Sequence, residues 1–295
     1  LGRDRPVLVQ VPRRGYVPAL ACGQCRAPAR CRRCAGPLAL LSVGHAACRW
    51  CGVAEARYRC PACGCARLRA TVTGARRTAE ELGRAFPGVV LYTSGGGSAS
   101  EEAGEGKVLA DIPPGPALVV ATTGAEPLAC YGAALLLDAA ALLGRPTLRA
   151  AEEALRRWMA AAAMVESATD GGRVVVVADA SLNAVQALIR WDPAGHARAE
   201  LTARAELGFP PAVRMAALDG APETLACLEI PAGAEVLGPV PVPGQPEGGR
   251  ERLLLRVPRS EGSALAGALA AVQAGRSARK ADDFLRVELD PQEVT

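Results

Sequence analysis

The sequence is poor in the residues on which several common chemistries depend. Its 295 residues include only two histidines, and aromatic residues make up 3% of the chain. Without further imidazoles, no Ser-His-Asp or Cys-His arrangement can be nominated. The longest apolar stretch, residues 132–144, is too short for a membrane span and contains Asp138, so no transmembrane segment is expected.

The first residues also lack the features of a targeting segment. The opening Leu-Gly-Arg-Asp-Arg sequence is not a signal peptide. Residues 6–11 already have the apolar pattern of a strand. We therefore expect the chain to be the C-terminal part of a longer protein in the cytoplasm.

Cysteine, by contrast, is abundant and regularly spaced. Eight of the eleven cysteines form Cys-x-x-Cys pairs. These pairs are Cys22/Cys25, Cys31/Cys34, Cys48/Cys51 and Cys60/Cys63. A two-residue gap lets both sulfurs face one metal ion, so the array predicts two tetrahedral Zn²⁺ sites. An odd cysteine count without a signal peptide disfavours disulfides, and a redox centre would need only one such pair.

The lengths of the loops predict which pairs share an ion. Five, thirteen and eight residues separate the successive pairs, and only the thirteen-residue spacer approaches the spacing of a zinc ribbon. One predicted site therefore consists of Cys31, Cys34, Cys48 and Cys51. The other pairs close a second site around it, formed by Cys22, Cys25, Cys60 and Cys63. Cys65 is an alternative to Cys63 as a ligand.

Positive charge is concentrated around these cysteines. Residues 1–84 contain sixteen arginines and four acids, a net charge of +12, whereas the whole chain carries +4. Cations on short, metal-braced loops suit a phosphate-binding surface, and we predict DNA contacts by Arg32, Arg33, Arg49 and Trp50. Two alternatives remain open. The arginines balance the charge of the zinc thiolates, or Trp50 and Tyr58 cap the zinc core instead of stacking on bases.

Beyond residue 66 the pattern changes to alternating strands and helices. Runs that are apolar at every position are typical of parallel strands covered on both faces. They are residues 117–121, 135–137 and 173–178. With helices predicted over 78–86, 148–164 and 182–207, the last interrupted at Pro193, they indicate a doubly wound α/β sheet.

The remaining sequence predicts a separate domain. Pro210 and Pro211 mark a boundary, and short strands with one helix over 263–274 indicate a small α+β domain. Residues 238–249 form a stretch rich in proline and glycine. The expected organisation is an α/β domain over 1–20 and 67–190, a double-zinc module over 21–66 and a C-terminal domain over 191–295.

Several short motifs occur in order along the chain. They are Arg13-Arg-Gly-Tyr16, the cysteine array, Phe86-Pro-Gly-Val89, Leu207-Gly-Phe-Pro-Pro211, Val236-Leu-Gly-Pro-Val-Pro241 and Glu288-Leu-Asp-Pro291. Together they resemble primosomal protein N′, the PriA family of replication-restart helicases. The resemblance implies a second RecA-like helicase lobe with an inserted double-zinc module, and a C-terminal domain that binds branched DNA. It also implies the nested zinc pairing.

The chain departs from this family in the elements for ATP hydrolysis. The phosphate-binding Gly-x-x-x-x-Gly-Lys-[Ser/Thr] loop is absent, since Lys107 is followed by Val108. The family's two arginines after the predicted helix are replaced, by our count, by Met164 and Ser167. The Gly-Thr-Gln-x-x-x-Lys-Gly segment is eroded over residues 121–127. Loss of a finger arginine alone reduces turnover by on the order of 10³–10⁵.

These observations predict a zinc-containing, DNA-binding replication-restart protein that recognises forks and single-/double-strand junctions without helicase turnover. One alternative is an active ATP-dependent 3′-to-5′ DNA helicase whose first lobe is missing from this chain. Another is a scaffold for protein assembly. The resemblance further implies single-stranded-DNA-binding protein and primosome proteins as partners, and a location at the nucleoid.

Overall fold

The computed structural model of the protein describes residues 4–12, 20–33, 36–40, 46–48, 53–70, 75–95, 107–137, 139–145, 147–242 and 249–293. The chain divides into two compact units. The first comprises Leu1–Arg145 with Arg149–Pro193, and the second comprises Pro146–Leu148 with Ala194–Thr295. Within the described ranges, no helix is long and apolar enough to cross a membrane.

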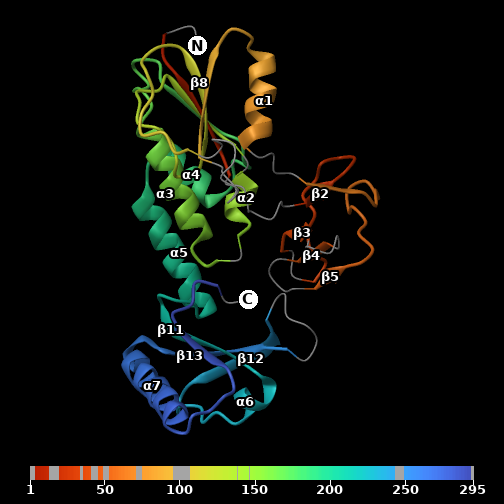
Figure 1. The fold of residues 1–295 in the computed structure, drawn as a ribbon, viewed down its shortest axis with the longest axis vertical. Helices are drawn as coiled ribbons and strands as arrows, with labels where there is room; N and C mark the ends of the chain where they lie inside the picture. Colours follow the sequence, from red (N-terminus) through yellow and green to blue (C-terminus); the bar gives the residue numbers. More distant parts are fainter. Residues whose placement is uncertain are drawn as a thin grey trace. The chain divides into compact units, whose positions relative to one another are not determined.

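A five-stranded parallel sheet forms the centre of the first unit (Figure 1). From one edge to the other its strands are β10 (Arg173–Val176), β9 (Ala133–Leu136), β1 (Val7–Val11), β8 (Ala117–Thr122) and β7 (Val90–Ser94). All six residues of β8 are buried, and so are the last four of β1. Their nearly continuous apolar sequences follow from this position, because central parallel strands are covered on both faces.

Helices cover both faces of this sheet. On one face, α1 (Ala75–Ala85) packs Ala75 and Ala79 against Val9 and Val120. Residues at odd positions of β1 face this side because side chains alternate along a strand. The sequence expectation of helices on both faces of a mostly parallel sheet therefore agrees with the structure.

The opposite face carries the larger core. It is covered by α2 (Ala139–Leu143), α3 (Ala150–Ala162) and α4 (Asn183–Arg190). Trp158 of α3 and Tyr131 before β9 are its largest fully buried side chains. The Tyr131 hydroxyl donates to the carbonyl oxygen of Pro127 at 2.8 Å, which satisfies its polar group within the apolar core.

One expectation for this unit is wrong, and one of its helices is not predicted from the sequence. The apolar run 173–178 predicts a strand covered on both faces, but β10 lies at the edge of the sheet and Val175 is 50% exposed. An apolar run alone does not distinguish a central strand from an edge strand. The sequence also gives no prediction of α2, because its alanines and leucines continue the apolar run of β9 almost without interruption.

The cysteine-rich segment lies between β1 and α1 in the sequence and forms two small antiparallel sheets. One pairs β2 (Leu20–Cys22) with β6 (Leu68–Ala70). The other contains β3 (Leu38–Leu40), β4 (Ala46–Cys48) and β5 (Ala54–Glu55). The pairing of Cys22 with Leu68 brings the two ends of the segment together.

The second unit begins with α5 (Pro193–Leu207) and contains an antiparallel sheet (Figure 1). Its strands in order are β12 (Glu235–Pro241), β13 (Glu251–Pro258), β11 (Val213–Gly220) and β14 (Leu285–Leu289). Two helices and a 3-10 turn complete it: α6 (Pro222–Ala226), α7 (Gly262–Ala278) and η1 (Arg259–Glu261). Leu265 and Leu269 of α7 pack against Leu218 and Leu255 of the sheet.

Strand β12 is not predicted from the sequence, which shows only a stretch rich in proline and glycine from residue 238. The strand continues to Pro241 and contains Gly238 and Pro239, with a register shift between Leu237 and Val240. Proline lacks the N–H that a central strand needs, but an edge strand tolerates it. The position of β12 at the edge therefore explains how this sequence forms a strand.

A buried ion pair joins the two central strands of this sheet. Asp219 of β11 lies opposite Arg252 of β13. The Arg252 Nε and Nη2 atoms donate to the two carboxylate oxygens at 2.7 and 2.9 Å, and the side chains are 11% and 9% exposed for Arg252 and Asp219. Nη1 also donates to the carbonyl oxygen of Glu293, which ties the end of the described chain to the sheet.

Removing one partner of this pair should destabilise the second unit strongly. We expect Arg252→Met to lower the free energy of unfolding by about 3–5 kcal/mol, because it leaves the Asp219 carboxylate buried without its counterion. Asp219→Leu combined with Arg252→Met should recover much of the loss. As a control, Arg286→Ala, at an exposed pair, should cost less than about 1 kcal/mol. Urea unfolding measures each value, and equal losses in the single and double variants would contradict this account.

Candidate metal centre

Four cysteines from opposite ends of the cysteine-rich segment meet in one place. The Sγ atoms of Cys22, Cys25, Cys60 and Cys63 all lie within 4.8 Å of one another. The Sγ atoms are 3.4 Å apart between Cys22 and Cys63, and 3.5 Å apart between Cys25 and Cys60. All four are free thiols. The structure thus brings together the set that the loop lengths predict for the outer site.

The geometry of the four sulfurs fits a tetrahedral metal ion. With metal–sulfur bonds of about 2.3 Å, the sulfurs of a tetrahedral Zn²⁺ site are separated by about 3.8 Å. The distances in the cluster lie around this value. Four thiolates leave no open coordination position, so a metal held here serves structure rather than catalysis. Zn²⁺ is the ion that this donor set suits best.

The backbone directs its amides at these sulfurs. Each thiol accepts a hydrogen bond from the N–H two residues further along, and the donors are Gln24, Ala27, Ala62 and Cys65 for Cys22, Cys25, Cys60 and Cys63 respectively. At Cys60, burial raises the pKa, but hydrogen bonds from the N–H groups of Ala62 and Cys63 and with the Cys25 and Cys63 thiols outweigh it, and the pKa falls from 9.0 to about 6. At the other three cysteines the amide hydrogen bonds lower the pKa, but burial and neighbouring thiols outweigh them and the pKa is raised. Amides that stabilise a thiolate favour the form that binds metal.

Tyr58 lies in the small core beside the cluster. It is 7% exposed and packs with Leu20, Leu38 and the buried cysteines. Its buried hydroxyl has no nitrogen or oxygen partner among the described residues. Burial, followed by hydrogen bonding to the Cys60 thiol, raises the pKa of Tyr58 to about 12. Because Tyr58 is buried, its ring is not exposed for stacking on bases.

The structure describes only half of the inner predicted site. Cys31 and Cys48 are both buried in the same core as Cys22 and Cys60. The N–H of Arg33 donates to the Cys31 sulfur at 3.3 Å, which repeats the turn seen at Cys22. Cys34 and Cys51 lie outside the described residues. Cys65 is half-buried beside the cluster but is not one of the four mutually close thiols.

Two of the four residues predicted to contact DNA lie in the described part of the chain. Arg32 and Arg33 are exposed, whereas Arg49 and Trp50 lie outside the described residues. The Arg32 guanidinium contacts the carbonyl oxygen of Arg57 at 3.4 Å and the Glu55 carboxylate at 3.9 Å. Arg32, which lies within the second Cys-x-x-Cys pair, therefore connects that turn to Glu55 of β5 and to Arg57. The sequence does not reveal this contact, because nothing in the spacing relates the two positions.

Comparison with known proteins gives consistent matches along the chain. The family model of the primosomal protein N C-terminal domain matches residues 205–292. The probable replication restart protein PriA of Mycobacterium leprae is 53% identical over 310 residues, covering 100% of this chain and 46% of the relative. That of Mycobacterium tuberculosis H37Rv is 52% identical over 312 residues, covering 98% and 46%. The chain belongs to the PriA family. It spans about half the length of these relatives.

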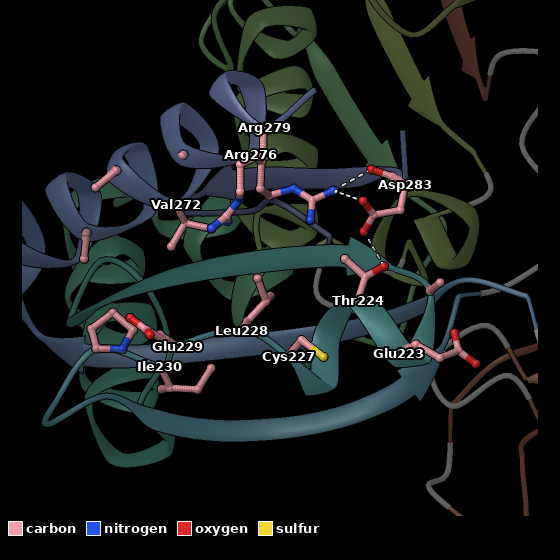
Figure 2. A pocket seen from close by; sticks show the side chains of 15 residues that line it. Glu223, Thr224, Cys227, Leu228, Glu229, Ile230, Val272, Arg276, Arg279 and Asp283 are labelled. Carbon is pink, nitrogen blue, oxygen red and sulfur yellow. Dashed lines mark hydrogen bonds and ion pairs between the residues drawn. The ribbon is translucent and has the colours of Figure 1, made fainter. Parts of the chain in front are cut away.

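A pocket in the second unit lies within the residues that the family model matches, and it was not predicted from the sequence (Figure 2). It has a volume of about 1000 Å³ and lies between α7 and the segment that starts with α6. The Asp283 carboxylate accepts hydrogen bonds from Thr224 at 2.7 Å and pairs with Arg276 at 2.9 Å. Three carboxylates and two guanidinium groups line the hollow, so it offers no net positive charge to phosphate.

The four-thiol geometry makes a sharp prediction about neighbouring cysteines. Cys63→Ser should lower the metal content of this PriA-family chain by one equivalent, because it removes one of four converging ligands. Cys65→Ser should leave the content unchanged, since its sulfur is outside the group. Elemental analysis of zinc in the two purified variants measures the difference. If Cys65→Ser lost the metal and Cys63→Ser kept it, the ligand would be Cys65.

Proposed function

We propose that this chain is the part of a PriA replication-restart protein that binds forked DNA at single-/double-strand junctions through a zinc-braced arginine surface. The observation that carries the proposal is the convergence of Cys22, Cys25, Cys60 and Cys63. The core around these thiols also contains Cys31, which directly precedes the exposed Arg32 and Arg33 in the sequence. Metal bound by these thiols supplies structural rigidity. Rigid loops then hold the guanidinium groups at fixed positions, where they bind phosphates.

The finer organisation follows the family. The parallel sheet is a second RecA-like helicase lobe, and the cysteine-rich segment is a double-zinc module inserted between its first strand and α1. Two Zn²⁺ ions are nested, with Cys31, Cys34, Cys48 and Cys51 at the inner site. The antiparallel pairing of β2 with β6 supports an insertion, because it brings the first and last strands of the cysteine-rich segment side by side.

The charges of the module favour DNA over simple neutralisation of thiolates. Arg32 turns toward Glu55 and a carbonyl group, not toward sulfur. Arg33 is exposed, and only its backbone N–H contacts a thiol. Arg67 is the exception, because its side chain lies near Cys65. Since phosphate contacts carry no sequence information, binding should depend on the shape of the junction.

The lobe itself acts as a scaffold without helicase turnover. The positions counted for the family's arginines hold Met164, which packs against the core, and Ser167, whose hydroxyl donates to Asp170 at 2.6 Å within a turn. Neither side chain stabilises charge on a transferring phosphate. We further infer that the protein acts at the nucleoid in the cytoplasm with single-stranded-DNA-binding protein and primosome proteins.

Arg33 offers the cleanest test of DNA binding. Arg33→Ala should weaken binding to forked DNA about equally for unrelated sequences, and should reduce the slope of log K against log salt by about 0.7–0.9. Its zinc content should stay unchanged, because the backbone N–H to Cys31 remains. Fluorescence anisotropy with labelled forks over a series of salt concentrations measures the affinity and its dependence on salt.

Two controls separate charge from position in this experiment. Arg77→Ala removes an exposed arginine of α1 outside the module and should change the slope little. Arg32→Ala should weaken binding but also loosen the contact with Glu55, and so lower the stability of the module. If Arg33→Ala and Arg77→Ala had the same effect, the arginines near the thiolates would be only counterions, and the scaffold for protein assembly would become the better account.

A second prediction concerns ATP. The full-length natural protein should bind forks but show no DNA-stimulated ATP hydrolysis above background. Met164→Arg with Ser167→Arg should not restore turnover, because phosphoryl transfer requires all parts of the site to be placed together and residues 121–127 are also changed. A phosphate-release assay with and without forked DNA measures this. Robust hydrolysis that is abolished by a change in the protein's own nucleotide pocket would favour the active helicase instead.

A further inference from the structure

Strand β10 leaves one edge of the five-stranded parallel sheet open. The N–H of Val177, just past the end of the strand, donates to the carbonyl oxygen of Leu136 in β9 at 2.9 Å. Successive residues of a strand direct their backbone groups to opposite sides, so those of Val174 and Val176 point away from β9. In the described part of the chain, no strand pairs with β10 on that side.

This edge lacks the features that usually protect an exposed strand. Residues 174–178 are four valines and an alanine, with no charge, proline or bulge among them. Val175 and Val177 are 50% and 57% exposed and lie on the same face of the sheet as Leu135. Val176 points to the opposite face and packs against the larger core. The edge therefore presents unpaired backbone groups next to an apolar surface.

Opposite charges flank the apolar run. Arg173 begins the strand and forms no ion pair among the described residues, whereas Asp179 follows the run. The Asp179 carboxylate accepts hydrogen bonds from the N–H and the hydroxyl of Ser181 at 2.9 and 2.8 Å, and these lower the pKa of Asp179. The carboxylate thus stays charged at neutral pH. An antiparallel copy of the same strand presents the two charges in reverse order, so each charge meets its opposite.

We propose that two copies of this chain pair through β10, antiparallel about a two-fold axis at Val176, and so join their parallel sheets. The outward backbone groups of Val176 then bond to those of the same residue in the second copy. Val175 lies opposite Val177 of the second copy, and Arg173 lies opposite Asp179. In both of these pairs the side chains approach more closely than in the hydrogen-bonded pairs. A two-fold axis makes each contact occur twice, which is the usual symmetry of a dimer.

The other edge of the same sheet does not have these properties. Its strand β7 also has an exposed valine, Val90, but residues 85–95 contain no charged residue that could select a register. Pairing through a single short strand buries less than the about 1,200 Å² of a stable interface. The dimer formed through β10 is therefore weak and forms only at high protein concentration.

Sedimentation velocity over a dilution series of the chain tests the proposal. The wild-type chain should shift from monomer to dimer as its concentration rises. Val175→Lys should raise the dimer Kd by about tenfold or more, because it places a charge on the apolar edge where the copies meet. Val90→Lys is the matched control, since it places the same charge on an exposed valine of the other edge. It should change the Kd by less than about threefold.

Exchanging the flanking charges tests the register. Arg173→Asp and Asp179→Arg should each raise the Kd by about fivefold or more, because each puts like charges opposite one another twice in the dimer. An equal mixture of the two variants should associate as the wild type does, since both opposed pairs in the mixed dimer are again of opposite charge. Circular dichroism of each variant shows that it has folded before it is mixed.

Several results would overturn the proposal. They are sedimentation that does not change with concentration, equal effects of Val175→Lys and Val90→Lys, and a mixture that associates no better than its components. If a longer natural form stays monomeric and Val175→Lys unfolds it, another part of that protein covers β10 and the dimer is wrong. Arg33→Ala should leave the dimer Kd unchanged, so this test is independent of the one for DNA binding.

Discussion

The convergence of four thiols determines the structure of the cysteine-rich segment. Its buried core contains alanines, two leucines, Tyr58 and the cysteines themselves, which bury too little apolar surface to hold a fold alone. Four thiolates at such short range repel one another unless a cation lies between them. A metal ion held by these thiols would supply folding free energy that the core does not, as in other small metal-dependent domains.

The close approach of its two ends explains how the basic, cysteine-rich segment fits between β1 and α1 of the α/β domain. Pairing of β2 with β6 brings the entry and exit of the segment together, so the insertion need not disturb the sheet order around β1. The parallel sheet has a hydrophobic core of its own, in which Trp158 and Tyr131 are the largest fully buried side chains. Positive charge is concentrated around the cysteine-rich segment, while the large hydrophobic core of the parallel sheet lies outside it.

The sequence predicts well the features that follow from residue spacing or from runs of apolar residues. The Cys-x-x-Cys spacing predicted the four cysteines whose thiols converge, and the apolar run around Val120 predicted a parallel strand covered on both faces. The prediction for β10 was wrong, because this strand is as apolar as a central strand but lies at the edge of the sheet. Strand β12, also at an edge, was not predicted because its sequence is rich in proline and glycine. The contact of Arg32 with Glu55 and the hollow between α6 and α7 depend on tertiary structure that no local pattern encodes.

The changes at the family's catalytic positions are consistent with the packing around them. Met164 has joined the hydrophobic core, and Ser167 closes a turn with Asp170. An arginine at Met164 would have to bring a charge against that core, where burial without a partner is costly.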